Sequence, residues 1–315
     1  MEQKKVSGPT IGIPRALLYH RYGVLWTEFW RQLGARVVVS KPTDRVTLDE
    51  GSALAEAEMC LSVKTYMGHV KALIGHCDYI MVPAYTGFGV RRTMCMTFQA
   101  LPDITRAVFR NSGQKFLTCS IGPGRGMSEE DGLSSMAESI GYGKKDAVRA
   151  YRAASKKAAA AYDARVKQNE ALYKKDGIKV IAAAHSYVAE DAFSGGYILE
   201  MLRKMGVTVI RADLTDRKKA LARSAHFSPT MKWEMNREIT GGMLNHWKEA
   251  DGLLLLSVYP CAPDSMVNEM ITRKMEDCGL PILTLTLDAQ NGVAGAETRL
   301  ESFIDIIRMK KGIRL

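Results

Sequence analysis

The chain has 315 residues, of which 46% are hydrophobic and 25% are charged. This length is typical of about two domains of ordinary size. No stretch approaches the roughly 20 apolar residues of a membrane span, and residues 1–5 lead into an apolar run without a signal-peptide core. These features exclude a membrane-spanning protein and predict a cytoplasmic one.

The net charge of +10 is concentrated in one segment. Residues 144–175 contain ten Lys or Arg and three acidic residues. The aromatic and glycine patterns of the common nucleic-acid-binding folds are missing, so we interpret this segment as a solvated helix face and predict no nucleic-acid partner. Attraction of an anionic ligand, such as the phosphates of coenzyme A, stays open as an alternative.

In chain order, the first half alternates β-branched runs with helical periods, which is typical of parallel sheets with helices on both faces. The predicted strands cover residues 10–13, 36–40, 79–83 and 115–120. A helix is predicted between Pro14 and Gly34, where apolar side chains recur at helical spacing. The loop 121–126 (IGPGRG) follows a strand, and we favour a plain turn over a phosphate-binding loop because it has no Lys-Ser/Thr ending.

The second half repeats the alternation after the basic segment. Its predicted strands cover residues 179–184, 207–212, 252–258 and 282–287, with helices after residue 196 and from Pro263. We therefore predict an α/β protein with two Rossmann-like parallel-sheet domains and a site in the crevice between them. The predicted boundaries are 1–143 for the N-terminal domain, 144–176 for a long basic connecting helix, and 177–315 for the C-terminal domain.

Three of the six cysteines, Cys60, Cys95 and Cys261, stand out because of the residues around them. Cys261 directly follows a predicted strand, at the carboxyl end where open α/β sheets bind ligands. A cysteine at a helix N-terminus has a lowered pKa, and iron binds the thiolate. The same position suits a nucleophile equally well. The other three cysteines, Cys77, Cys119 and Cys278, are interpreted as packing residues, and no disulfide framework is expected.

The sequence resembles the 2-hydroxyacyl-CoA dehydratase and benzoyl-CoA reductase family along nearly its whole length. It is most similar to the activase-related subgroup, described as like the D-component of 2-hydroxyglutaryl-CoA dehydratase. The similar sequence motifs, in chain order, are residues 11–17 (IGIPRAL), Cys60 with 68–70 (GHV), Cys95 with 99–103 (QALPD), Trp233 with 261–265 (CAPDS), and 294–299 with Phe303.

The resemblance implies a metal site and a partner. In that family three cysteines hold a [4Fe–4S] cluster between two Rossmann-like domains, and relatives carry a double-cubane [8Fe–9S] cluster. By resemblance, Cys60, Cys95 and Cys261 are the candidate ligands here. The family passes a single low-potential electron into an acyl-CoA thioester, and an ATP-dependent activase with its own iron–sulfur cluster supplies that electron. Relatives pair as dimers, which predicts a dimer by analogy.

Further candidates lie near these cysteines. Lys64 and His69 follow Cys60 on one predicted helix, and Arg91 and Arg92 precede Cys95. Lys64 and the two arginines are candidates for an anionic ligand, whereas His69 is a candidate for a hydrogen bond to the cluster. For each, a solvated or helix-packing role is the alternative. His185 lies at a strand end, and Arg237 with Glu238 is expected to form a buried structural ion pair.

Some positions depart from the family pattern: Ser62 replaces a usual proline, and Met96 follows Cys95 where Cys-Pro is usual. Three hypotheses therefore stay open. The chain is an iron–sulfur lyase or reductase acting on an acyl-CoA thioester or a smaller substrate, a non-catalytic cluster carrier or electron-transfer protein, or a metal-free α/β protein that binds an anion.

Overall fold

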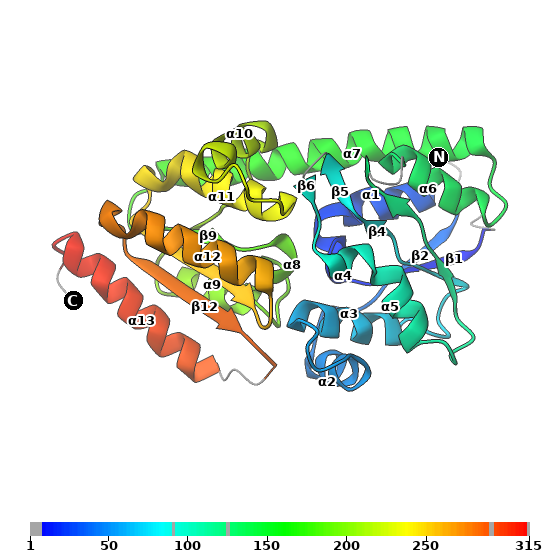
Figure 1. The fold of residues 1–315 in the computed structure, drawn as a ribbon, viewed down its shortest axis with the longest axis horizontal. Helices are drawn as coiled ribbons and strands as arrows, with labels where there is room; N and C mark the ends of the chain where they lie inside the picture. Colours follow the sequence, from blue (N-terminus) through cyan, green and yellow to red (C-terminus); the bar gives the residue numbers. More distant parts are fainter. Residues whose placement is uncertain (1–7, 90–91, 124–126, 290–292, 314–315) are drawn as a thin grey trace. The chain divides into compact units, whose positions relative to one another are not determined.

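The structure is a computed structural model that describes residues 8–89, 92–123, 127–289 and 293–313 (Figure 1). The chain divides into two compact units. The first contains Met1–Tyr162 and Lys232–Glu234, and the second contains Asp163–Met231 and Met235–Leu315. This division falls inside a single helix, α7 (Lys144–Ala171). The predicted boundaries at residues 143 and 176 treat that helix as a separate connector, and they stay a prediction.

The first unit is built on a four-stranded sheet with the order β2-β1-β3-β7, in which all neighbours are parallel. The strands are β1 (Thr10–Ile13), β2 (Arg36–Val39), β3 (Tyr79–Met81) and β7 (Lys115–Leu117). All four residues of β1 are buried, because a central parallel strand is covered by helices on both faces. The chain adds β2 on one side of β1 and β3 on the other, so the direction of winding reverses between β1 and β3.

Strands β3 and β7 are shorter than predicted because Pro83 interrupts them. Proline has no backbone N–H and cannot donate to a ladder. Pairing resumes beyond it, where β4 (Ala84–Tyr85) lies parallel to β8 (Ser120–Ile121). Val82 N and Ala84 N donate across this break to Leu117 O and Cys119 O, both at 2.8 Å. A short antiparallel hairpin follows, formed by β5 (Gly87–Gly89) and β6 (Arg92–Thr93).

Helices cover both faces of the first sheet (Figure 1). On one side lie α1 (Tyr19–Gln32), α6 (Glu129–Glu138) and the N-terminal half of α7, and on the other lie α2 (Arg45–Leu54), α3 (Leu61–Lys71) and α5 (Leu101–Val108). Short helix α4 (Met96–Gln99) precedes α5. Helix α6 begins where Ser128 caps it by accepting from Asp131 N.

Helices α2 and α3 approach each other backbone to backbone at two glycines. A Cβ atom on Gly51 would lie 1.9 Å from Lys64 O, and one on Gly68 would lie 1.9 Å from Thr47 O. No side chain fits in these spaces, so glycine is required for this packing. The requirement explains Gly68 within the sequence word GHV.

The second unit contains a parallel sheet with the order β10-β9-β11-β12. Its strands are β9 (Lys179–Ala183), β10 (Thr208–Arg211), β11 (Gly252–Val258) and β12 (Ile282–Leu287). The order repeats that of the first unit, with the reversal between β9 and β11. Together the two sheets confirm the predicted α/β fold with two Rossmann-like domains.

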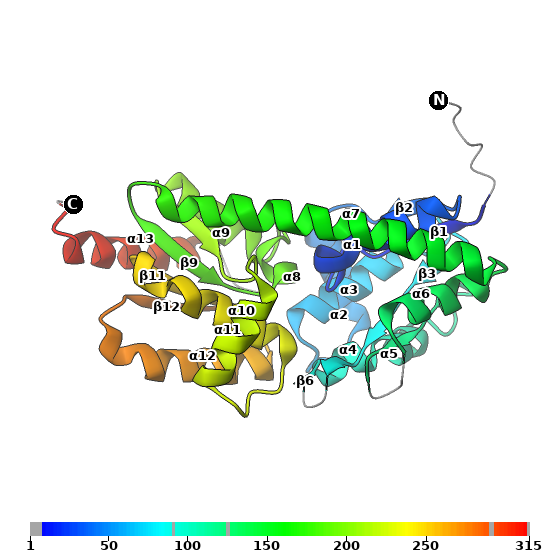
Figure 2. The ribbon, with the colours of Figure 1, turned by 90° about the horizontal axis from the view of Figure 1, so that it is seen from above.

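Helices also cover both faces of the second sheet, with α9 (Gly196–Lys204) and α13 (Val293–Lys310) on one face and α11 (Glu234–His246) and α12 (Ala262–Met275) on the other (Figure 2). Gly252 in β11 leaves room for Ile307 and Phe303 of α13, since its Cβ would lie 2.6 Å and 2.8 Å from them. The remaining elements are α8 (Ser186–Ala189), α10 (Arg217–Phe227), and the 3₁₀ helices Leu172–Lys174, Trp247–Glu249 and Glu276–Cys278.

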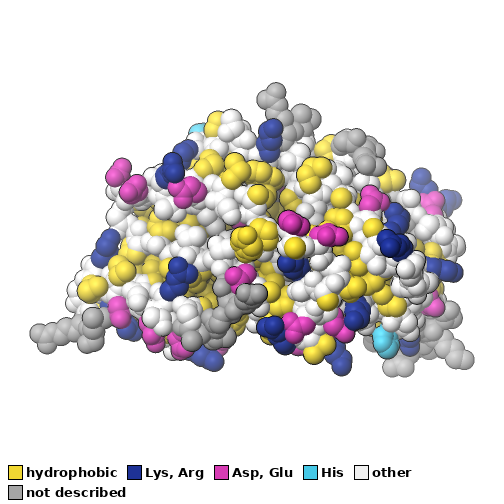
Figure 3. Space-filling model, turned by 60° about the horizontal axis from the view of Figure 1, so that its bottom comes forward, with side chains coloured by type: hydrophobic (Ala, Val, Ile, Leu, Met, Phe, Trp, Pro, Cys, Tyr) yellow, Lys and Arg dark blue, Asp and Glu magenta, His cyan; other side chains and the backbone are white. Residues whose placement is uncertain are grey.

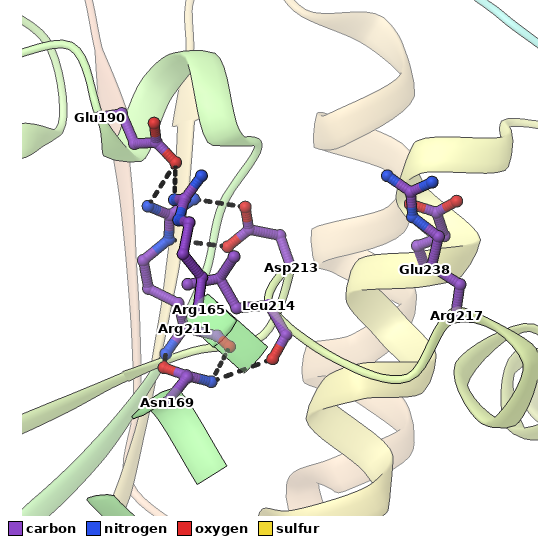
Figure 4. A network of polar contacts seen from close by, with 8 residues as sticks. All are labelled: Arg165, Asn169, Glu190, Arg211, Asp213, Leu214, Arg217 and Glu238. Carbon is purple, nitrogen blue, oxygen red and sulfur yellow. Dashed lines mark hydrogen bonds and ion pairs between the residues drawn. The ribbon is translucent and has the colours of Figure 1, made fainter. Parts of the chain in front are cut away.

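A polar network attaches the C-terminal half of α7 to the second sheet (Figure 4). Arg165 pairs with Glu190, and Asn169 donates to Arg211 O at 2.8 Å while accepting from Arg211 N at 2.9 Å. The Arg211 side chain pairs with Glu190 at 2.8 Å and with Asp213. Burial alone would lower the pKa of Arg211. The carboxylates of Asp213 and Glu190 outweigh burial and hold the pKa above its ordinary value.

The expected ion pair between Arg237 and Glu238 is corrected by the structure. Glu238 lies 3.8 Å from Arg217 Nε, so its recorded partner comes from α10 (Figure 4). Arg237 is adjacent to Glu238 in the same helix, and neighbouring helical positions do not face each other. A partner from another helix is therefore the geometrically natural one.

The face shown in Figure 3 mixes hydrophobic, basic and acidic side chains.

Two basic residues on the N-terminal half of α7 form ion pairs, in which Arg152 lies 3.1 Å from Glu130 and Lys157 lies 2.7 Å from Glu28. Exposed pairs of this kind contribute little to stability. They reduce the positive charge that the segment presents to solvent.

Candidate functional site

Each of the three candidate cysteines is the N-cap residue of a helix. Cys60 precedes α3, Cys95 precedes α4, and Cys261 precedes α12. Cys60 and Cys95 have nearly the same backbone conformation, with φ, ψ of −64°, 153° and −63°, 156°. In each case the cysteine carbonyl accepts the first helical hydrogen bonds. The local structure therefore places each thiol at a helix N-terminus, and the dipoles of the longer helices α3 and α12 favour a negative charge at Cys60 and Cys261.

The other three cysteines have different environments. Burial raises the pKa of the Cys77 thiol to about 11 and that of Cys119 to about 12. Cys77 packs on β1, since a Cβ on Gly12 would lie 2.6 Å from its sulfur. The packing interpretation is wrong for Cys278, which is exposed in the 3₁₀ helix that follows α12. This 3₁₀ helix connects α12 to β12 and leaves the Cys278 side chain in solvent.

The surroundings of Cys261 contain a buried polar cluster within the second unit. His185 follows β9, and its Nε2 lies 2.8 Å from Asp264 Oδ1. Asn236 Nδ2 of α11 donates to the same oxygen at 2.7 Å. The His185 ring stacks on Tyr187, with centroids 4.8 Å apart. We name His185, Asn236 and Asp264 the Asp264 cluster.

The Asp264 side chain is buried, with the residue only 4% exposed. Burial raises the pKa of this carboxyl, but His185, Asn236 and the Cys261 thiol outweigh burial and hold the pKa below its ordinary value. The Asp264 cluster lies beside the carboxyl ends of β9 and β11, where the winding of the second sheet reverses. Ligands of open α/β sheets bind at such a point.

The predicted ligand-binding residues near Cys60 contact the protein itself. Lys64 Nζ donates to Ala57 O at 2.9 Å, across the turn that leads into Cys60. His69 is 1% exposed, and its Nδ1 and Nε2 each lie 2.9 Å from a hydroxyl, of Ser40 and Thr43 respectively. Ser40 Oγ also accepts from Arg15 N at 2.8 Å. These contacts favour the packing alternative for His69, which ties α3 to the carboxyl end of β2.

This arrangement predicts a stability effect. His69→Leu is expected to lower the free energy of unfolding by about 2 kcal/mol, because it removes one hydrogen bond from the buried Ser40 hydroxyl and one from the half-buried Thr43 hydroxyl. Urea unfolding followed by circular dichroism measures the change. His76→Leu is the control, because His76 is exposed just after the same helix and should change stability by less than about 0.5 kcal/mol. Equal effects would contradict the role given to His69.

Of the two arginines before Cys95, the structure describes Arg92 but not Arg91. Arg92 Nη1 lies 3.1 Å from Glu234 Oε1, and its Nη2 donates to Phe88 O at 2.7 Å. Thr93 N donates to Lys232 O at 2.9 Å, so the hairpin is fixed to residues 232–234. Arg91 lies outside the described residues, as do Gly124, Arg125 and Gly126 of the glycine-rich loop.

No group of three or more His, Cys, Asp or Glu side chains in the described part of the chain is arranged to hold a metal ion. Cys60 and Cys95 belong to the first unit, and Cys261 belongs to the second. The sulfur of each cysteine is nevertheless a type of ligand that iron binds, and all three cysteines are partly exposed at helix N-termini.

Asp264 and Asn236 are members of the cluster that sequence reasoning missed as functional candidates. The sequence places Asp264 only within a helix predicted from Pro263, and nothing in the local sequence pairs it with residues 79 and 28 positions away. A weak signal existed, since Asp264 lies within the word CAPDS. His185 was noted only as a residue at a strand end.

The fold and the helix-terminal cysteines define a doubly wound α/β protein of two parallel-sheet units. The sequence model described as "CoA enzyme activase uncharacterised domain (DUF2229)" matches residues 10–215, and the chain belongs to this family. This agrees with the expected relation to activase-related proteins. No curated protein matches the chain.

Among solved structures, one that is similar is titled "Crystal structure of ZnuA". It is 11% identical, covers 96% of this chain and 99% of its own, and has a TM-score of 0.27. Another is a sugar transporter from Clostridium phytofermentans, 10% identical, covering 98% of this chain and 95% of its own, with a TM-score of 0.21. Such distant similarities indicate no function. In the described residues, no helix has both the length and the apolar character that crossing a membrane demands.

Proposed function

We propose that this protein is an iron–sulfur protein that binds a [4Fe–4S] or double-cubane [8Fe–9S] cluster through Cys60, Cys95 and Cys261. The observation that carries the proposal is selective placement. The three cysteines picked out by sequence resemblance are N-cap residues of α3, α4 and α12, whereas the other three cysteines begin no helix. Burial opposes thiolate formation at Cys77 and Cys119 by raising their pKa values, whereas the positive ends of the α3 and α12 dipoles lie at Cys60 and Cys261.

When bound, such a cluster supplies low-potential one-electron chemistry. We infer that the acceptor is an acyl-CoA thioester or a small substrate and that the donor is an ATP-dependent activase with its own cluster. The family description, which names a CoA enzyme activase, supports a role in that system. The chain's own part is to hold the sulfur ligands at helix N-termini.

A second candidate is a non-catalytic carrier of the cluster. Lys64 and Arg92 are the described cationic residues predicted to bind an anionic ligand, and each contacts a carbonyl or carboxylate of the protein. A protein that only carries the cluster needs no site for the phosphates of CoA. The engaged state of these two side chains therefore favours this candidate.

Anaerobic purification and reconstitution test the proposal. We expect about four irons per chain for a single cubane or about eight for a double cubane, with matching sulfide and a visible absorption band. Absence of bound iron and sulfide after reconstitution would show that the proposal is wrong and leave a metal-free α/β protein. If iron and sulfide are bound, turnover of thioesters with an activase and ATP separates the catalytic protein from the carrier.

A further inference from the structure

The second sheet ends at an edge strand, β12, whose sequence has none of the features that keep edge strands apart. Its six residues include no charged residue and no proline. The other edge strands of the two four-stranded sheets, β2, β7 and β10, have three or four residues, and each contains an Arg or a Lys. Short length, charged side chains and proline are the usual means by which an edge strand avoids pairing with another chain.

The backbone of β12 presents hydrogen-bonding groups on its outer side. In a parallel ladder, alternate residues bond to the same neighbouring strand. Leu287 O accepts from Tyr259 N, just past the end of β11, at 2.7 Å, so the odd-numbered residues of β12 bond to β11. Ile282 and Thr284 therefore direct their N–H and C=O groups away from β11. No strand in the described part of the chain pairs with that side.

The opposite edge of the same sheet is covered from within the second unit. Asn169 of α7 donates to Arg211 O of β10 at 2.8 Å and accepts from Arg211 N at 2.9 Å. An amide side chain thus occupies the backbone groups that another strand would use at that edge. The two edges of the sheet therefore differ in what the chain itself supplies to them.

Helix α13, which runs alongside β12 (Figure 1), exposes apolar side chains near its C-terminal end. Ile306 is 43% exposed and Met309 is 59% exposed, and Ile313, just beyond the helix, is 44% exposed. Their spacing of three and four residues places them on one flank. A single exposed apolar residue is ordinary, whereas a row of three marks a candidate contact surface.

Two lysines show which flank of α13 this is. Lys310 Nζ donates to Gly279 O at 2.8 Å, shortly before β12, whereas Lys311 pairs with Asp251 at 2.6 Å, immediately before β11. The flank that carries Lys310 is therefore the one on the β12 side. Ile306 lies one helical turn before Lys310, so it belongs to that flank. The apolar row and the outer edge of β12 consequently lie on the same side of the sheet.

We propose that the outer edge of β12 and the adjacent flank of α13 form a homodimer interface, in which two copies of β12 pair antiparallel across a two-fold axis. This pairing joins the four-stranded sheets of two second units into one. The axis places the two α13 helices side by side on one face of the joined sheet, where their apolar flanks exclude water from each other. The resemblance predicts a dimer without assigning a surface to it, whereas this surface follows from β12 and α13 themselves.

The charge of this region favours a second copy as the partner. Residues 282–313 contain four acidic and four basic residues, so their net charge is zero, whereas the whole chain carries +10. A two-fold axis brings a segment against its own copy, where any net charge would repel itself. The inference goes beyond the proposed function and does not depend on a bound cluster.

The test measures the mass of the full-length protein by sedimentation equilibrium over a range of concentrations. Thr284→Lys places a charge on the exposed edge, opposite or near its own copy, and Ile306→Asp places one on the apolar flank. Val46→Asp is the control, because Val46 is 63% exposed on α2 of the first unit. Circular dichroism establishes that each variant is folded. If Ile306→Asp does not fold, Met309→Asp changes the same flank.

We expect a dimer for the unmodified protein and for Val46→Asp, and a dissociation constant at least about tenfold higher for Thr284→Lys and Ile306→Asp. Hydrogen exchange in peptides that cover residues 282–287 should slow as the unmodified protein dimerises, because outer N–H groups become bonded. A monomer at concentrations up to about 100 μM would overturn the inference. A dimer that both variants leave unchanged would do so as well. Iron analysis of the same samples reports on the proposed function separately.

Discussion

Serine in place of Cys60, Cys95 or Cys261 is expected to remove the visible absorption of the reconstituted protein. Iron should fall from about four per chain to less than about one, because a serine hydroxyl is a poor ligand for a cluster that requires thiolates. Iron and sulfide analysis with anaerobic absorption spectra measures the loss. Thermal unfolding of the apo proteins should change little, since all three side chains are partly exposed.

The matched control for this series is Cys278→Ser. Cys278 follows the C-terminal end of the same helix that Cys261 caps, and it is exposed. It should retain the iron content and spectrum of the unmodified protein. Equal loss in Cys261→Ser and Cys278→Ser, or full retention in Cys261→Ser, would contradict the assignment of the ligands.

Gly68→Ala is expected to destabilise the first unit by about 3 kcal/mol. The new Cβ would lie 1.9 Å from Thr47 O, which is a backbone atom and cannot rotate away. Helices α2 and α3 must separate to accept it, which forfeits packing along their contact. For a unit of this size the midpoint of thermal unfolding should fall by roughly 6–12 °C, as measured by circular dichroism or calorimetry.

Gly295→Ala provides the opposite case. Gly295 is an exposed helical residue of α13, and a Cβ built on it meets nothing within 4 Å. Alanine is a better helix former than glycine, so this variant should be neutral or stabilised by up to about 1 kcal/mol. An unchanged transition in Gly68→Ala would show that α2 and α3 do not pack as described.

The main elements of the fold could be predicted from the sequence because their signals are local. β11 and β12 have the predicted bounds, since each is an uninterrupted apolar or β-branched run that ends at a turn. Helix α2 was not predicted, because few of its residues are apolar. Asp44 caps it by accepting from Thr47 N, a signal that was present in the sequence.

The candidate site divides in the same way. The positions of Cys60 and Cys261 next to predicted helices could be inferred locally, whereas the short helix after Cys95 and the contacts of Lys64, His69 and Arg92 could not. His69 meets hydroxyls 29 and 26 residues away, and Arg92 meets a carboxylate 142 residues away. A side chain that can bind a ligand can equally bind its own protein, and only the folded chain decides which.

The sequence by itself determined the α/β class, the order of the parallel strands along the chain and the positions of Cys60 and Cys261 at the start of helices. These depend on periodicity and on capping, which act over a few residues. The tertiary structure alone decided the Asp264 cluster, the close approach of α2 and α3, and the exposure of Cys278. Such features arise where segments distant in the chain meet, and burial there assigns charge, pKa and packing that no local pattern encodes.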